Sequence, residues 1–292
     1  MKKLLILSGK GGTGKTTTAA AFIELSHARA FADCDVDAPN LHLISDFTGE
    51  PQCKDFLGSE KAVIDASKCI GCGICQSKCR FEAISQSNNI YSITDYACEG
   101  CGLCAYLCPQ KAITMVEDIA GWQQLYRSTN NTEEKVFSTA KLKMGRGNSG
   151  KLVTAVKTEL IAKAPQTELA IIDGSPGLGC PVIASMNGVD MVLVVAEPSL
   201  SGRSDLERLI KAASGFRVKL AVCVNKWDTN PQAAQAIEDF CQENRLPFLG
   251  CIPYDATASK AINLGKSIVQ YDCPAGQALR KIYTKALELL EL

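Results

Sequence analysis

The sequence predicts an α/β fold with a doubly wound, mostly parallel sheet and a small α+β module inserted into it. Nearly continuous apolar runs alternate with stretches of helical spacing, which is typical of parallel strands buried between helices. A glycine-rich turn separates the first apolar run from the first helical stretch. The alternation is interrupted where eight of the 15 cysteines fall between Cys69 and Cys108.

The first strand is expected over residues 3–8 and the first helix over 16–26. Only the six residues 27–32 lie between that helix and Asp33, so the helix or the second strand must be short. The patterns divide the chain into a first part of a nucleotide-binding domain, an insert, and a second part of that domain. Their expected bounds are 1–58, 59–116 and 117–292.

The remaining elements belong to the third segment. Residues 122–128 and 136–141 predict two strands joined by the polar stretch 129–134. Later strands are expected at 169–173, 191–196, 220–225 and 250–252, and helices at 205–214, 232–244 and 275–292.

Composition excludes several classes of protein. Lys and Arg together number 31, as do Asp and Glu, so net charge does not favour a nucleic-acid partner. No apolar stretch approaches the roughly 18 residues that span a bilayer, and the run Leu4–Leu7 is too short for a signal peptide. We therefore expect a cytoplasmic protein with no stable membrane anchor. Clustered cysteines in such a chain indicate a metal site.

The segment from Gly9 to Thr16 matches the phosphate-binding pattern G-x-x-x-x-G-K-[ST] between a strand and a helix. Its backbone N–H groups can surround phosphate oxygens. Lys15 is expected to neutralise the β and γ phosphates, and Thr16 to hold Mg²⁺. The predicted nucleotide-contacting residues here are Gly11, Gly12, Thr13, Gly14, Lys15, Thr16 and Thr17.

Lys10 is unusual for this pattern. With it, residues 10–17 (KGGTGKTT) resemble the deviant phosphate loop of the superfamily of MinD, ParA and the nitrogenase iron protein. In that family the early lysine reaches the partner's phosphates across a nucleotide-sandwich dimer. The resemblance thus implies a catalytic role in trans for Lys10, and a dimer of two copies or with a related chain.

Two further segments resemble the switch regions of the family. In the first, Asp33–Asn40, Asp35 aligns with the carboxylate thought to position the attacking water. Asp33 and Asp37 could instead hold water on Mg²⁺ or cap the next helix. In the second switch, Asp173 would accept hydrogen bonds from Mg²⁺-bound water.

Two segments after later strands resemble the adenine-contacting segments of the family. Asn225 and Lys226 form the first, with Asn225 as the base reader. Pro253, Tyr254 and Asp255 form the second.

The pattern C-x₂-C-x₂-C-x₃-C occurs twice, and this is the spacing of bacterial ferredoxins with two [4Fe–4S] clusters. In that pattern the fourth cysteine of each run binds the cluster of the other run. One cluster is therefore expected on Cys69, Cys72, Cys75 and Cys108, and the second on Cys98, Cys101, Cys104 and Cys79. The alternative is a pair of zinc sites, against which the doubled spacing argues.

Together these motifs resemble a MinD-superfamily ATPase of the P-loop NTPase type with an inserted ferredoxin-like domain. The implied cofactors are ATP, Mg²⁺ and two [4Fe–4S] clusters. The main functional prediction is ATP hydrolysis coupled to electron transfer to a redox or metallocofactor partner protein.

Two alternatives remain open. The first is an iron–sulfur or metal-cofactor scaffold or carrier, and such carriers share a C-x-x-C pair that is not found here outside the eight clustered cysteines. The second is a MinD/ParA-like positioning ATPase, which needs a membrane or DNA handle. The final helix has Arg280, Lys281 and Lys285 beside Glu288 and Glu291, and we expect it to pack against the domain.

Two features have no assigned role. Cys180 lies where the nitrogenase iron protein has one of its two cluster ligands, but residues 143–147, which match the second, contain no cysteine. A bridging cluster is therefore not expected. Residues 148–153 are either a loop facing a nucleotide or cluster, or the start of a helix.

Overall fold

The computed structural model describes residues 1–292 apart from 46, 48, 89 and 131–132. Within these residues the chain forms two compact units. The first contains residues 1–53, 123–141 and 150–292, and the second contains 54–122 and 142–149.

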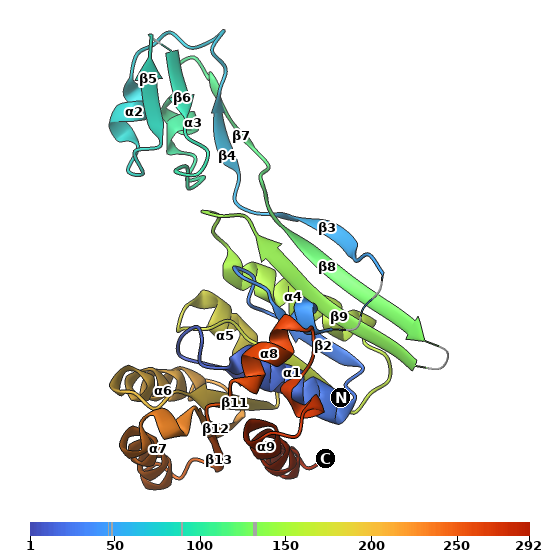
Figure 1. The fold of residues 1–292 in the computed structure, drawn as a ribbon. Coiled ribbons are helices and arrows are strands. Elements are labelled where there is room, and N and C mark those ends of the chain that lie inside the picture. The colour runs from blue at the N-terminus through green and yellow to red at the C-terminus, as the bar shows by residue number, and fades with distance from the viewer. Residues whose placement is uncertain (46, 48, 89, 131–132) are drawn as a thin grey trace. The chain divides into compact units, whose positions relative to one another are not determined.

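The main sheet has the strand order β13-β12-β11-β1-β10-β2-β9-β8-β3 in the described part of the chain (Figure 1). All neighbouring pairs from β13 to β9 are parallel. This confirms the predicted α/β class and its mostly parallel sheet. The strands are β1 (Lys2–Leu7), β2 (Ala30–Asp33), β3 (Gln52–Leu57), β8 (Ile119–Asn130), β9 (Glu133–Leu142), β10 (Leu169–Asp173), β11 (Met191–Ala196), β12 (Lys219–Asn225) and β13 (Phe248–Ile252).

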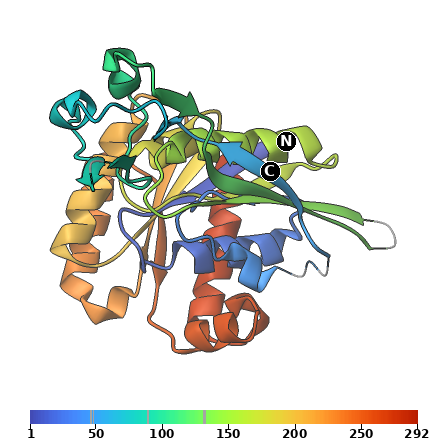
Figure 2. The same cartoon turned by 90° about the horizontal axis from the view of Figure 1, so that it is seen from above.

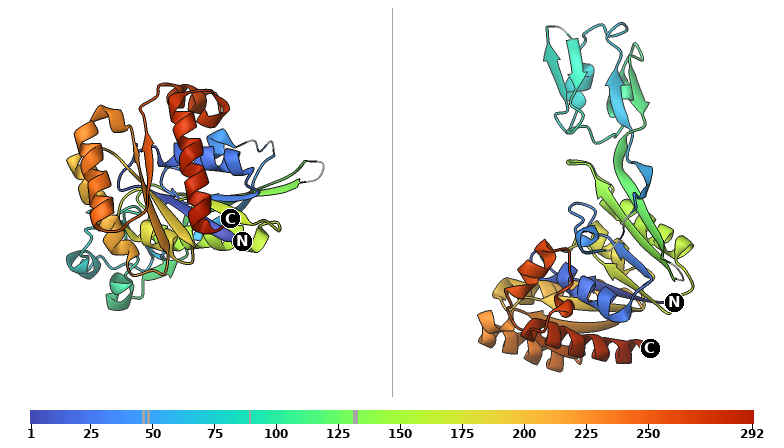
Figure 3. Two further views of the ribbon diagram at one scale, coloured as in Figure 1. Left: turned by 90° about the horizontal axis from the view of Figure 1, so that it is seen from below. Right: turned by 45° about the vertical axis from the view of Figure 1, so that its right-hand side comes forward.

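Helices lie on both sides of the sheet (Figures 2 and 3). The inner strands are accordingly apolar on both faces, and Leu4, Leu5, Ile6 and Leu7 of β1 are all fully buried. The helices of this unit are α1 (Lys15–Ser26), α4 (Ser149–Lys163), α5 (Cys180–Met186), α6 (Leu200–Ala213), α7 (Pro231–Glu243), α8 (Thr257–Asn263) and α9 (Pro274–Leu290), with short 3₁₀ turns η1 (Leu41–Ile44), η2 (Trp227–Thr229) and η3 (Ile268–Gln270).

Two local expectations are confirmed and one is wrong. The second strand is short, because β2 has only four residues. Strands β8 and β9 are the expected pair, although residues 131–132 between them lie outside the described residues. Helix α6, however, begins at Leu200 and not at 205, because the Ser199 hydroxyl accepts a hydrogen bond from the backbone of Gly202 and caps it.

The second unit repeats one local arrangement. Strand β4 (Lys61–Ile64) pairs with β7 (Ile113–Val116), and β5 (Ile84–Ser87) pairs with β6 (Ile90–Ile93), both antiparallel. The short helices α2 (Ile74–Lys78) and α3 (Leu103–Leu107) each follow a glycine in the left-handed conformation, at φ 73° for Gly73 and 74° for Gly102.

The core of this unit is small. One buried apolar cluster contains Ala62, Ala83, Cys98 and Ile113, and the partly buried side chains against it include Cys75, Cys79, Cys104 and Cys108. Several of the clustered cysteines therefore occupy the interior of the unit. So small a core usually needs a covalent or metal cross-link for stability.

Candidate functional site

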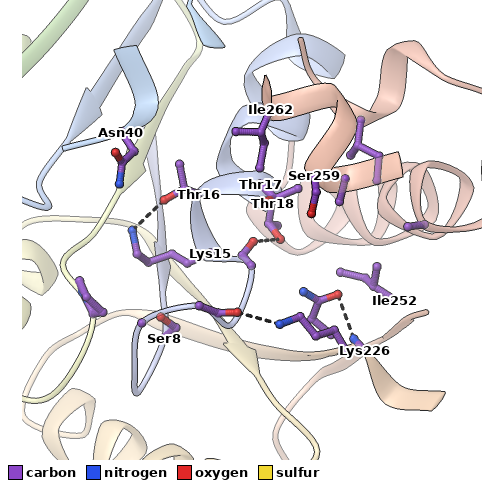
Figure 4. A pocket seen from close by; sticks show the side chains of 18 of the residues that line it. Ser8, Lys15, Thr16, Thr17, Thr18, Asn40, Lys226, Ile252, Ser259 and Ile262 are labelled. Atoms are coloured by element: carbon purple, nitrogen blue, oxygen red, sulfur yellow. Dashed lines mark hydrogen bonds between the residues drawn. The ribbon is translucent and has the colours of Figure 1, made fainter. Parts of the chain in front are cut away.

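The phosphate loop connects β1 to α1, and side chains at the end of β12 donate hydrogen bonds to its backbone. The Asn225 side-chain amide donates to the carbonyl of Thr13 at 2.7 Å, and the Lys226 ammonium donates to that of Gly12 at 2.9 Å. Figure 4 shows the Lys226 amine directed at the loop. Gly14 lies at φ 95°, and a Cβ on it would lie 2.1 Å from the Asn225 amide nitrogen. The loop and Asn225 therefore form one packed element.

A cavity of about 700 Å³ opens over this loop. That volume is typical of a site for a small organic ligand. One end is lined by Asp35, Asp37 and the loop residues from Gly11 to Thr18 other than Thr13. The other end includes the apolar side chains of Ile252, Ile262, Ile268 and Leu279, together with Pro253, Tyr254 and Asp255. The first end suits phosphates, and the second suits a planar base.

Charged groups are paired at the phosphate end. The Lys15 ammonium lies 2.6 Å from one carboxylate oxygen of Asp173, and the Thr16 hydroxyl donates to the other at 2.6 Å. Lys15 is 5% exposed and Asp173 is fully buried. Burial opposes the charge on Lys15, but Asp173 outweighs it and raises the pKa of Lys15 above its usual value. The side chains predicted to bind phosphate and magnesium thus bind one another.

Asp33 holds the first switch segment in place. Its buried carboxylate accepts backbone hydrogen bonds from Asp35 at 2.9 Å, Asn40 at 2.9 Å and Leu41 at 3.0 Å. Of the two roles left open for Asp33, the structure therefore shows a cap at the start of η1. Burial, with a further contribution from Asp173, raises its pKa to about 7. Asp35, half-buried and beside the cavity, also has a raised pKa, mainly because of burial.

Lys10 does not line this cavity. Its ammonium lies 2.5 Å from the Glu197 carboxylate and 3.3 Å from the Ser201 hydroxyl. Sequence reasoning missed Glu197, because nothing in the local pattern at the end of β11 indicates a partner 187 positions earlier in the chain.

The second unit contains two cavities that the clustered cysteines line. One, of about 20 Å³, is lined by Cys69, Cys72, Cys75 and Cys108. The other, of about 230 Å³, is lined by Cys79, Cys98, Cys101 and Cys104, with Cys75 also at its wall. Each cavity thus includes three cysteines of one run and the last cysteine of the other.

The thiols around each cavity interact electrostatically. Burial, and then the proximity of Cys69 and Cys72, raises the pKa of Cys75. Burial also raises the pKa of Cys104, with contributions from Cys98 and Cys101. In the part of the chain that the structure describes, no three His, Cys, Asp or Glu side chains are arranged to hold a metal ion.

The two unassigned features are now located. Cys180 is exposed at the start of α5. Residues 149–153 form the first turn of α4, so this segment is the start of a helix, preceded by Asn148 at φ 71°. The side-chain amide of Asn148 donates to the Ser59 hydroxyl at 3.0 Å within the second unit.

Comparison with known proteins identifies the family. The model of the CobQ/CobB/MinD/ParA nucleotide-binding domain matches residues 4–268. The chain belongs to this family. Two uncharacterized proteins of Methanocaldococcus jannaschii are 31% and 27% identical to it, over 99% and 93% of this chain and 97% and 93% of their own lengths. The septum site-determining protein MinD of Neisseria meningitidis serogroup B is 23% identical over 98% of this chain and 91% of its own.

Solved structures of the family share the fold. The cell division ATPase MinD of Pyrococcus furiosus superposes with a TM-score of 0.59 at 16% identity and covers 99% of both chains. McdA of Cyanothece in complex with ATP superposes with a TM-score of 0.57 at 18% identity, over 100% of this chain and 97% of its own. These comparisons confirm the MinD/ParA part of the predicted resemblance. None of the proteins named here is described as an iron–sulfur protein. No helix in the described residues is long and apolar enough to cross a membrane.

Proposed function

We propose that this family member is an ATPase that dimerises around MgATP and carries two [4Fe–4S] clusters, through which electrons reach a partner protein. The observation on which the proposal depends is the pair of cavities in the second unit. Each is lined by the four cysteines that the doubled ferredoxin spacing assigns to one cluster.

The nucleotide half of the proposal assigns roles in the large cavity. Lys15 and the loop amides bind the β and γ phosphates, while Thr16 and Asp173 hold Mg²⁺. To do so, Lys15 and Asp173 must exchange their mutual ion pair for phosphate and metal. Asp35, at the cavity wall, positions the attacking water. The base occupies the apolar end near Pro253 and Tyr254.

The cluster half depends on how the thiols are arranged. Cys69, Cys72, Cys75 and Cys108 would hold one cluster, and Cys98, Cys101, Cys104 and Cys79 the other. When bound, each cluster would store and transfer single electrons. The first of these sets lines the smaller cavity, of about 20 Å³, and the second lines the larger, of about 230 Å³. Cys72 and Cys101 are exposed, which favours exchange of electrons with a docked protein.

A positioning ATPase is the second candidate, and the named relatives favour it over electron transfer. Two septum site-determining MinD proteins are among the relatives. A positioning ATPase needs a segment that binds a membrane or DNA, and the contacts of the final helix give little support for such a role. Arg280 donates to the carbonyl of Val269, and Lys285 donates to that of Leu249 at 3.0 Å. Leu279 and Ile282 of the same helix are buried.

A scaffold or carrier of iron–sulfur clusters is the third candidate, and it shares the cluster chemistry with the electron-transfer proposal.

Anaerobic reconstitution with iron and sulfide tests the cluster proposal. We expect about eight irons per chain. The reduced protein should give an EPR signal that changes when MgATP is added. The Cys69→Ser variant should lose about half of the iron, whereas the Cys180→Ser variant should keep it all. Two zinc ions and no iron would overturn the cluster proposal. If protein without iron sediments with vesicles or DNA only when MgATP is present, the positioning ATPase is favoured.

A further inference from the structure

Lys10 is bound within its own chain by residues at the junction of β11 and α6. Its ammonium lies 2.5 Å from Glu197 Oε2 and 3.3 Å from Ser201 Oγ. The Ser201 hydroxyl is in turn 3.2 Å from that of Ser199. Lys10 and Glu197 have side chains that are 39% and 27% exposed. The ion pair is therefore partly shielded from water but open to replacement by a new partner.

The backbone on both sides of this pair is fixed. The Ser8 hydroxyl donates to the carbonyl of Lys10 at 2.9 Å. On the other side, the Ser199 amide donates to the carbonyl of Glu197 at 2.8 Å, and a Cβ on Gly202 would lie 2.2 Å from that same oxygen. Both backbones are thus held by hydrogen bonds, and rotation of the Lys10 side chain alone is enough to break the pair.

We infer that Glu197 is a positioning residue that holds Lys10 in its own chain until a second copy of the chain, with its bound nucleotide, takes the lysine away. This inference depends on the proposed dimer, in which Lys10 acts on the partner's phosphates. A lysine cannot neutralise Glu197 and a phosphate of the other chain at once. Each chain must therefore give up this ion pair when the dimer closes.

The size of the effect follows from the exposure of the pair. Partly exposed ion pairs typically shift an equilibrium by about two- to fivefold. A dimer with both lysines transferred must break two such pairs. The apparent dimer dissociation constant is raised by the product of the two factors, which is about four- to 25-fold.

The test compares the dimerisation of full-length variants in the presence of Mg²⁺ and an ATP analogue that is not hydrolysed. Sedimentation velocity over a series of protein concentrations measures the dimer dissociation constant. Glu197→Gln keeps the size of the side chain and removes its charge. We expect its dimer dissociation constant to fall by about four- to 25-fold. Ser201→Ala should lower the constant by a smaller factor. Glu207→Gln is the matched control, because it breaks the exposed Arg203–Glu207 pair on the same helix, and we expect no change.

A variant with both Lys10→Ala and Glu197→Gln separates positioning from general electrostatics. If Glu197 acts through Lys10, the second substitution has no effect once Lys10 is absent. An equal gain in both backgrounds would overturn the inference, as would unchanged or weaker dimerisation of Glu197→Gln. If the unaltered chain does not dimerise with nucleotide at any concentration, the proposed dimer itself is wrong.

Discussion

Three buried ionisable side chains form the centre of the nucleotide site: Lys15, Asp33 and Asp173. The sequence identified all three by their motifs, because each motif is a short local pattern. It did not indicate that Lys15 and Asp173 bind one another at 2.6 Å, since these residues are brought together only by the parallel pairing of β1 and β10. Motif residues could therefore be predicted, whereas their mutual contacts could not.

Asp35 should act on hydrolysis more than on binding. Asp35→Ala is expected to lower kcat by at least about tenfold, because a residue that positions water acts chiefly in the transition state. Nucleotide affinity, measured by fluorescence titration with a labelled ATP, should change by less than about threefold. Asp37→Ala is the matched control, since this exposed carboxylate lines the same cavity. Equal rates for the Asp35 variant and the unaltered chain would refute the assignment.

Asp33 should make stability depend on pH. Its pKa is about 7 in the folded chain against 3.8 for an ordinary aspartate. An acid with a raised pKa contributes stability that is complete below about pH 4 and is lost as the pH rises to about 7. The measurement is carbon NMR of the labelled carboxyl groups of nucleotide-free protein. The Asp33 signal should titrate near pH 7, whereas that of Asp65, whose pKa is lowered by hydrogen bonds from Ser67, should titrate below its usual value. An Asp33 carboxyl group that is still ionised at pH 5 would contradict this prediction.

At the scale of elements, buried strands were the most predictable. The bounds of β10 and β11 agree with the apolar runs, because a strand buried on both faces has to be apolar throughout. Strand β3 was not expected, since its residues Gln52–Leu57 are mostly exposed and include Lys54 and Asp55. The start of α6 lies five residues before the expected one, where the Ser199 hydroxyl caps the helix and Gly202 packs closely against the Glu197 carbonyl.

Arg146 joins the segment 142–149 to two other parts of the second unit. The Arg146 guanidinium lies 2.5 Å from the carboxylate of Asp95 and 2.9 Å from that of Asp118, and it also donates to the Asp95 carbonyl at 2.9 Å. Its own side chain is only 8% exposed. Two separate loops of the unit are therefore linked through Arg146.

Arg146→Gln should loosen this unit. We expect a loss of about 1–3 kcal/mol from its local stability, because the change leaves the largely buried Asp118 without its ion pair. Hydrogen exchange of the amides around Asp95 and Asp118 measures it, with faster exchange expected there and no change in the first unit. Arg127→Gln, which removes an exposed pair with Glu134, should have little effect. Unchanged exchange near Asp95 would show that the contacts contribute no stability.

For the whole molecule, the proposed dimer makes catalysis depend on association. ATPase activity per chain should rise with protein concentration, since each site lacks its second cation until the partner supplies Lys10. Lys10→Ala should lower the rate by at least about tenfold and remove the dependence on concentration. Nucleotide affinity should change little, because Lys15 and the loop remain. Steady-state assays across a hundredfold range of protein measure this. A rate per chain that is constant with concentration, and the same in the variant, would exclude the mechanism.

The crossed distribution of cysteines has a consequence for biosynthesis. The first cavity takes its fourth thiol from Cys108 and the second takes one from Cys79, so neither run of cysteines completes a cavity alone. During translation, the first run emerges from the ribosome before Cys108. Until then, only Cys69, Cys72 and Cys75 of the first set of four are present. Both sets of four become complete only after the second run has emerged. Loading of the proposed clusters would therefore be a late event, and a chain that stops before residue 108 would leave Cys69, Cys72 and Cys75 without their fourth thiol.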